Sequence, residues 1–423
     1  MKKAILLLGM TIFVAGVLFL RNAEADTVLI KQNTNASGME TQVQNTEELH
    51  KTEIENATEQ ETEAELETEG VSETGQENEQ SITKPEDISK GFTFEKLSLE
   101  EQQVYTEILS SLLSLRKEIT LSTKDTSIID KVFQCVMLDH PEIFYVDGYK
   151  YTEYTSGEKT EKIVFSGNYL YDDAEIISRR DQIEKAVLKI LTEVPDTEDE
   201  YQKVKYIYET IISQTEYDTG SEDNQNICSV FLNGRSVCQG YAKAVQYLLR
   251  KVGMEAALVV GTVRQGDGHA WNLVSVNGEW YYLDATWGDA YYMLGGELQN
   301  IAVTGSSSVN YDYLCVTTKQ LEKTHTIEMP ITMPECIAIA DNYYVREGLY
   351  FDCYDEARIQ EIFVAASKNG SETVTIKCSD SVVYETICEE LIEKQKVFQY
   401  IQAENGSIAY TDNAEQGSIT FWL

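Results

Sequence analysis

The sequence predicts an α+β fold for residues 92–423. Apolar residues recur at helical spacing after Ser98 and again after Ser236, which predicts amphipathic helices. Alternating apolar residues on both sides of Asn277-Gly278 predict an antiparallel hairpin, because this dipeptide favours a tight type I′ turn. At 423 residues the chain exceeds one typical domain. We expect five parts: a targeting segment at 1–25, an acidic linker at 26–91, an α/β support region at 92–199, a core at 200–325 and a small α/β module at 326–423.

The first 25 residues have the three parts of an export signal. Lys2 and Lys3 give a positive start, an apolar run extends to Leu20, and Ala23-Glu24-Ala25 is a small-x-small cleavage site. An uncleaved membrane anchor is the alternative, because the apolar run is near the length that spans a bilayer. In both cases we expect an extracellular or cell-surface protein that meets the membrane only through this segment, if it is uncleaved.

Residues 26–91 are acidic and contain no aromatic side chain. They include 17 acidic and 4 basic residues and no Phe, Tyr or Trp. Such a segment cannot bury enough apolar surface to offset its conformational entropy, so we expect a disordered spacer. The whole chain has 71 acidic and 34 basic residues, a formal net charge of −37, which argues against nucleic acid as a partner.

The support region and the C-terminal module show helical and strand patterns without a chemical motif. Ser98 and Glu101 form a capping-box pattern, which predicts the start of the first helix. Further helices are expected at 127–138, 179–191, 198–213, 355–367 and 382–400, and strands at 143–146, 162–171, 343–351, 373–378, 407–410 and 419–422.

Cys238 lies at the predicted start of a helix. Ser236 and Gln239 form a capping-box pattern that predicts a helix beginning at Ser236, and Gly253 provides its stop. The free N–H groups and the positive end of the helix dipole stabilise a thiolate in the first turn. Cys238 is therefore a candidate nucleophile.

The predicted hairpin brings a histidine and an aspartate to the same face. The Asn277-Gly278 turn pairs residue 276 with 279, 274 with 281 and, by extension, 271 with 284. Side chains alternate between faces, so His269 and Asp284 share one face as diagonal neighbours, with β-carbons roughly 7 Å apart. This geometry lets an acid orient an imidazole. A thiolate, an imidazole and an orienting carboxylate are the parts of a nucleophilic acyl-transfer site.

Three sequence blocks resemble those of the transglutaminase-like superfamily. They are Gly234-Arg-Ser-Val-Cys-Gln-Gly-Tyr-Ala-Lys-Ala244, Gly268-His-Ala-Trp-Asn272 and Trp280-Tyr-Tyr-Leu-Asp-Ala-Thr-Trp287. The order Cys, His, Asp and the spacings of 31 and 15 residues are also similar. The run Asp139-His-Pro-Glu-Ile-Phe-Tyr-Val146 resembles one found ahead of this core in Gram-positive bacterial members.

The resemblance implies a papain-like fold and acyl transfer through a thioester. It implies a transglutaminase core in which a central helix carrying Cys238 packs on an antiparallel sheet that presents His269 and Asp284. The expected substrate is a protein, a peptide or a cell-wall peptide, attacked at a peptide, glutamine or cell-wall amide bond. Hydrolysis is slightly favoured. A protein cross-linking transferase with an amine acceptor and a non-catalytic surface binding module remain alternatives.

Other candidate residues have weaker support. The side-chain amide of Gln225 and the backbone N–H of Cys238 are candidate oxyanion donors. Trp271 and Trp287 are candidate walls of the cleft, with core packing as the alternative. His325 and His140 are expected to be structural. The sequence has no metal-ligand or nucleotide-binding motif, so we expect no cofactor and no metal.

Overall fold

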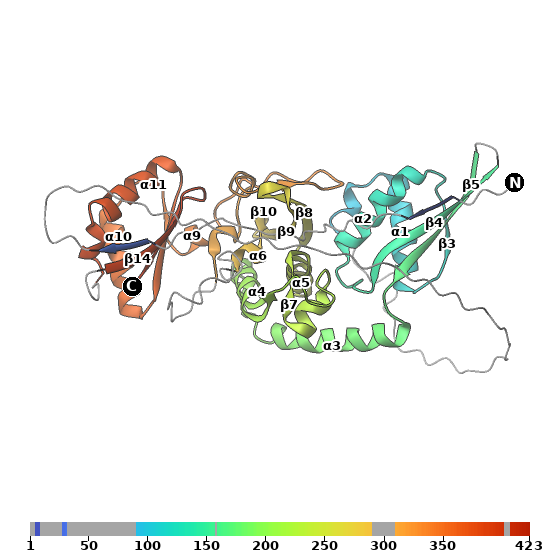
Figure 1. Cartoon of the computed structure of the whole chain (residues 1–423), viewed down its shortest axis with the longest axis horizontal. Coiled ribbons are helices and arrows are strands. Elements are labelled where there is room, and N and C mark those ends of the chain that lie inside the picture. Colours follow the sequence, from blue (N-terminus) through green and yellow to red (C-terminus); the bar gives the residue numbers. More distant parts are fainter. Residues whose placement is uncertain (1–4, 9–27, 32–89, 157–158, 290–308, 402–406) are drawn as a thin grey trace, which may run out of the picture. The chain divides into compact units, whose positions relative to one another are not determined.

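The computed structural model describes residues 5–8, 28–31, 90–156, 159–289, 309–401 and 407–423 (Figure 1). Helices alternate with mostly antiparallel sheets, which confirms the predicted α+β class. The predicted targeting segment lies outside these ranges except for strand β1 (Ile5–Leu8). The predicted linker lies outside them except for residues 90–91 and strand β2 (Val28–Lys31), where no regular structure was expected. Val28-Leu29-Ile30 is an apolar, β-prone run, which favours a strand.

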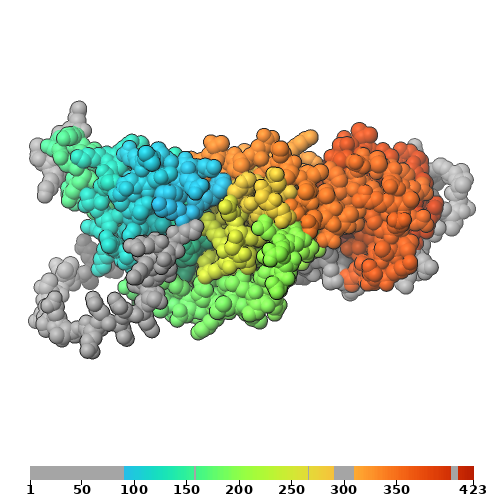
Figure 2. All heavy atoms as spheres, turned by 180° about the vertical axis from the view of Figure 1, so that it is seen from behind, coloured from blue at the N-terminus to red at the C-terminus, as the bar shows by residue number. Residues whose placement is uncertain are grey.

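The N-terminal region packs helices against a sheet with the strand order β1-β4-β5-β3. Ser98 begins the first helix as predicted, because Ser98 and Glu101 make both hydrogen bonds of the capping box. The α3 helix begins six residues before its predicted start, since Asp172 caps it; its outer face lies at the surface (Figure 2). The elements are α1 (Leu99–Leu113), β3 (Ile119–Leu121), α2 (Ile129–Asp139), β4 (Val146–Ser156), β5 (Lys159–Tyr169) and α3 (Asp173–Leu191).

The predicted strand at 143–146 is wrong. After Pro141 the chain turns, the N–H of Ile143 donates to the carbonyl of His140, and β4 begins only at Val146. Ile143, Phe144 and Tyr145 are all buried. Their apolar character therefore reflects burial of an irregular segment, which a strand also requires, so pattern alone does not separate the two.

Asp139 fastens the first described residues of the folded region to the end of α2. Its buried carboxylate accepts from the N–H and the hydroxyl of Thr93 and from the hydroxyl of Tyr105. The neighbouring His140 ring lies between Tyr105 (2.9 Å) and Glu142 (2.7 Å). Asp139 and His140 thus connect the end of α2 to α1 and to Thr93 through buried hydrogen bonds.

The core is an antiparallel sheet with the order β10-β9-β8-β11, against which α5 packs. Asn272 on β9 donates from Nδ2 to the carbonyl of Ala242 on α5 at 2.8 Å, which fixes helix to sheet. The elements are α4 (Glu200–Gln214), β6 (Glu216–Tyr217), a π-helical turn (Ser229–Asn233), β7 (Arg235–Ser236), α5 (Cys238–Lys251), β8 (Ala256–Val263), β9 (Gly268–Val276), β10 (Glu279–Leu283), α6 (Ala285–Gly288), α8 (Thr318–Leu321) and β11 (His325–Ile327).

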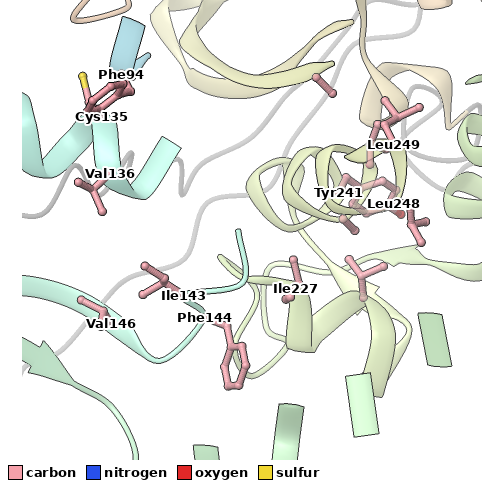
Figure 3. Packing of buried hydrophobic residues seen from close by; sticks show 14 of the residues in the cluster. Phe94, Cys135, Val136, Ile143, Phe144, Val146, Ile227, Tyr241, Leu248 and Leu249 are labelled. Atoms are coloured by element: carbon pink, nitrogen blue, oxygen red, sulfur yellow. The ribbon is translucent and has the colours of Figure 1, made fainter. Parts of the chain in front are cut away.

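The support region and the core share one hydrophobic cluster. Tyr241, Leu248 and Leu249 of α5 are buried in the same cluster as Phe94 and Val136 of the N-terminal region (Figure 3). The helix that carries Cys238 is therefore held on one side by the sheet and on another by the support region.

The C-terminal module has a mixed sheet with the order β12-β13-β15-β14-β2. The predicted strand at 343–351 is wrong, because Asn342 caps a short helix and only Tyr350 and Phe351 are extended. The predicted helix at 382–400 is also interrupted, with a left-handed backbone at Gln395 (φ 58°). The elements are α9 (Tyr343–Arg346), β12 (Tyr350–Phe351), α10 (Glu356–Asn369), β13 (Thr373–Cys378), α11 (Ser381–Cys388), a π-helical turn (Glu389–Glu393), a 3₁₀ turn (Lys396–Gln399), β14 (Ser407–Asn413) and β15 (Ser418–Trp422).

A buried ion pair links the module to the core. Lys377 Nζ on β13 lies 2.8 Å from Asp312 Oδ1, and Ser418 donates to Asp312 Oδ2 at 2.6 Å. The side chains of Lys377 and Asp312 are 3% and 4% exposed, so neither charge is solvated by water. Gln416 also donates to the hydroxyl of Tyr313 at 3.3 Å.

All eight cysteines are free thiols. Among the described residues, no helix combines the length and the apolar character that crossing a bilayer requires.

Candidate active site

Cys238 is the first residue of α5 and is half-buried. The predicted capping box at Ser236 does not form; Val237 is the N-cap residue, and no side chain caps the helix. The Ser236 hydroxyl instead bonds to the hydroxyl of Ser229 (2.6 Å) and to the carbonyl of Asn224 (3.1 Å). The N–H groups of the first turn of α5 therefore have no side-chain cap at the nucleophile, where the helix dipole favours negative charge.

Gly240 allows the preceding loop to approach the first turn of α5 closely. A β-carbon at this position would lie 1.9 Å from Ser236 Oγ and 3.0 Å from the carbonyl oxygen of Asn224. The loop that contains Asn224 and Gln225 is thereby fixed beside Cys238. The N–H of Val237 donates to the carbonyl of Asn224 at 3.5 Å, close to the geometric limit.

The predicted hairpin register is confirmed. Val276 pairs with Glu279 and Val274 with Tyr281. Asn277 and Gly278 both have positive φ angles, 52° and 85°, as a type I′ turn requires. Asp284 follows β10 directly, so the hairpin sets its distance from His269.

Asp284 uses its two carboxylate oxygens for different purposes. Oδ1 accepts from the N–H groups of Thr286 (2.9 Å) and Trp287 (3.1 Å) and thus caps α6. Oδ2 lies 2.7 Å from Nε2 of His269 and 3.1 Å from Nε2 of His325. The carboxylate therefore has four N–H partners and is completely buried.

The surroundings of His269 favour its imidazolium form. Burial alone would lower the pKa of this imidazole, but the Asp284 carboxylate and the Cys238 thiol raise it to about 10. Burial would raise the pKa of the Asp284 carboxyl, but His269 and His325 hold it well below its usual range. Because Nε2 of His269 faces Asp284, Nδ1 is the ring nitrogen left for the thiol. This arrangement favours a thiolate–imidazolium pair.

The predicted tryptophans pack on the imidazoles. The ring of Trp271 lies 5.9 Å from the His269 ring and 4.9 Å from the His325 ring, and Trp287 lies 6.1 Å and 4.8 Å from them. Both indoles are buried, at 0% and 3% exposure. They pack on the two histidines from inside the protein, which favours the core-packing alternative over a place in the wall of a cleft.

Gln225 is half-buried beside the first turn of α5. Its carbonyl accepts from Nζ of Lys243 at 3.1 Å. Among the described residues, no hydrogen bond occupies its side-chain amide. Lys243 is buried, and burial lowers its pKa to about 8. The Gln225 amide is thus available to a ligand, and its role as an oxyanion donor stays a prediction.

His325 is the site residue that sequence reasoning missed. It lies 41 positions after Asp284 and reaches the carboxylate through the pairing of β11 with β8. A lone histidine at a strand start gives no periodic signal, so only the fold reveals the contact.

The His269–Asp284–His325 group has the donor atoms of a metal site. The three ligand atoms lie within 4.8 Å of one another. However, the 2.7 Å and 3.1 Å separations are hydrogen-bond distances, shorter than the spacing of about 3.4 Å between ligands of a tetrahedral zinc ion. The geometry therefore fits protons better than a metal ion.

Comparisons with known proteins found one family and several solved structures. Residues 189–285 match the family described as the transglutaminase-like superfamily. A solved structure titled as that of a TGase is 14% identical, with a TM-score of 0.24, and the match covers 40% of this chain and 50% of that one. The periplasmic domain of TgpA from Pseudomonas aeruginosa is 16% identical, with a TM-score of 0.22, and the match covers 32% and 57%.

The chain thus spans little more than half the length of these structures. No curated protein matches the chain. The matched segment, 189–285, contains α4, the cysteine-bearing helix α5 and the hairpin with His269 and Asp284. Over this segment the chain is similar to the transglutaminase-like superfamily.

Proposed function

We propose that this protein is an exported cysteine-dependent acyl-transfer enzyme with Cys238 as nucleophile, His269 as proton carrier and Asp284 as orienting acid. The observation that supports this proposal most is the 2.7 Å contact between Asp284 Oδ2 and His269 Nε2. Cys238 interacts with the same imidazole and contributes to its raised pKa. A nucleophile, a base and an orienting group in contact are the parts that this reaction class needs.

Acylation begins from the thiolate–imidazolium pair. The sulfur of Cys238 attacks the carbonyl carbon of an amide, and the carbonyl electron pair moves to oxygen. The backbone N–H of Cys238 and the amide of Gln225 donate to this oxyanion. The oxyanion then collapses, the C–N bond breaks, and Nδ1 of His269 gives its proton to the leaving amine, which leaves a thioester on Cys238.

Deacylation uses the same imidazole as a base. His269 takes a proton from water, the hydroxide attacks the thioester carbonyl, and the thiolate leaves as the acid product forms. An amine in place of water would give a new amide bond and a cross-linking reaction. We favour hydrolysis of peptide or cell-wall amide bonds, with cross-linking as the second candidate.

The alkylation rate of Cys238 against pH tests the proposal. Iodoacetamide reacts with thiolates, and peptide mass mapping distinguishes Cys238 from Cys353, an exposed thiol in the same chain. The proposal expects Cys238 to react at its full rate well below about pH 8.5, the ordinary thiol pKa. The pKa of Cys353 is raised by its hydrogen bond with Asp352, so this thiol should react only at higher pH.

The variant His269→Ala provides the comparison. Loss of the low-pH reactivity of Cys238, with Cys353 unchanged, would support an activated pair. Identical profiles in wild type and variant would leave a non-catalytic binding module as the better interpretation. With an active protein, incorporation of a labelled primary amine into a glutamine-containing protein would identify a cross-linking enzyme; release of acid product alone would identify a hydrolase.

A further inference from the structure

His325 is enclosed by the site although it does not reach the surface. Its side chain is 0% exposed. Nε2 lies 3.1 Å from Asp284 Oδ2, and Nδ1 lies 2.8 Å from the hydroxyl oxygen of Thr324. The rings of Trp271, Trp287 and Tyr313 lie 4.8–5.7 Å away.

The hydrogen bonds assign the protons of this ring. Asp284 is ionised, because His269 and His325 hold the pKa of its carboxyl low even though it is buried. An ionised carboxylate only accepts, so Nε2 of His325 carries the hydrogen. Burial lowers the pKa of His325, which favours the neutral ring, and Nδ1 lies 2.8 Å from the Thr324 hydroxyl. His325 therefore serves Asp284 as an N–H donor from Nε2.

This second donor completes the surroundings of Asp284. A carboxylate has about four acceptor positions, and here two backbone N–H groups and two imidazoles fill them. Without His325, one lone pair of Oδ2 would face a buried space lined by aromatic rings. Such a carboxylate could turn away from His269 or admit water beside it.

We propose that His325 is a positioning residue that holds the Asp284 carboxylate in the orientation that aligns His269 with Cys238. The inference rests on the proposed function. His325 does not touch substrate, because its side chain is enclosed, so its effect reaches the reaction through Asp284 and His269. The titratable groups around the ring are His269, Asp284 and Tyr313.

Two variants separate the N–H donor from the bulk of the ring. His325→Phe keeps an aromatic ring but removes the donor, and His325→Gln keeps an N–H donor. We expect His325→Phe to lower the iodoacetamide rate at Cys238 about tenfold at pH 7, since one hydrogen bond to a charged group is lost. His325→Gln should stay within about threefold of wild type. Cys353 serves as the internal reference in both variants.

His140→Phe is the matched control for loss of a buried histidine. His140 is 1% exposed and has two hydrogen-bond partners, Tyr105 and Glu142, outside the site. We expect this variant to lose stability but to keep its Cys238 reactivity. If His325→Phe does not fold, His325→Asn replaces it, because the shorter amide cannot reach Asp284 as the longer glutamine does.

Histidine NMR provides a direct readout. The chain has four histidines, so ¹⁵N-histidine labelling gives a simple spectrum. We expect one ring that carries its proton on Nε2 at pH 7 and whose signals are absent in His325→Gln. Absence of a proton on Nε2 at pH 7 would overturn the proton assignment and with it the proposal.

The outcomes distinguish this inference from the proposed function. If His269→Ala loses the low-pH reactivity but His325→Phe reacts like wild type, His325 only fills space and the inference fails alone. If His269→Ala also reacts like wild type, the proposed function fails. A slower alkylation of Cys238 in His325→Phe, together with a near wild-type rate in His325→Gln, would support both the inference and the proposed function.

Discussion

Replacing Asp284 with asparagine tests the link between the carboxylate and the nucleophile. The amide oxygen of asparagine can still accept from the N–H groups of Thr286 and Trp287, so α6 stays capped. The amide nitrogen then occupies the place of Oδ2, where the N–H groups of His269 and His325 point. Donors would face donors, so His269 loses its acceptor and turns to the other tautomer.

The structure gives the size of the effect. The pKa of His269 rises from its ordinary value of 6.5 to about 10, a difference equivalent to about 5 kcal/mol in favour of the imidazolium. Cys238 supplies part of this stabilisation, and we expect loss of the carboxylate to remove about 3 kcal/mol of it. The alkylation rate of Cys238 at pH 7 should therefore fall about 100-fold. Because the pKa is raised, the imidazolium of the wild type persists through neutral pH and is lost only as the pH rises through about 10.

The assay is iodoacetamide labelling of Cys238 from pH 5 to 10, with Cys353 as reference. Circular dichroism and thermal unfolding establish that the variant is folded. Retention of more than a tenth of the wild-type rate by a folded Asp284→Asn protein would refute the reasoning, because the carboxylate would then not maintain the ion pair.

Three further predictions concern packing and buried charge. Gly240→Ala should destabilise the protein by about 2 kcal/mol and slow the alkylation of Cys238, because the new β-carbon meets Ser236 Oγ. Adding Ser236→Ala should restore part of the stability, measured by urea unfolding, and part of the alkylation rate, measured by labelling. Burial lowers the pKa of Lys243 from 10.5 to about 8. The buried charged form therefore lowers the free energy of unfolding below pH 8, and this loss is recovered as the pH rises from 8 to 10.5. The unfolding free energy of wild type minus that of Lys243→Met should thus increase by about 3 kcal/mol over this window; a flat difference would contradict the pKa. Lys377→Met should lower the free energy of unfolding by about 3–5 kcal/mol, because the Asp312 charge stays buried without its partner. Adding Asp312→Leu to this variant should recover most of the lost stability. Additive losses from the two substitutions would argue against the ion pair.

The site was predictable where local chemistry determines geometry. The Asn277-Gly278 turn sets the hairpin register, and the register brings His269 and Asp284 together. The first turn of α5 was placed correctly at Cys238 for a partly wrong reason, since Ser236 bonds to Ser229 and Asn224 and does not cap the helix. A hydroxyl that can cap a helix can equally bond to a neighbouring loop, and the sequence does not rank the two.

The remaining errors have two sources, a contact between distant residues and two local turns. His325 reaches Asp284 only because β11 pairs with β8, a pairing that no local pattern encodes. The aromatic runs at 143–146 and 343–351 have the composition of strands. A turn after Pro141 and a cap at Asn342 redirect them. Residues 143–145 are buried without alternating, whereas in 343–351 only Tyr344 and Phe351 are buried.

The double use of Asp284 has an evolutionary consequence. One oxygen closes the start of α6 and the other serves the imidazole, so selection for a folded protein and selection for chemistry act on the same residue. A descendant that lost its cysteine would still be under pressure to keep the aspartate. The presence of this aspartate in a related sequence is therefore poor evidence of activity, whereas residues at positions 238 and 269 are the informative ones.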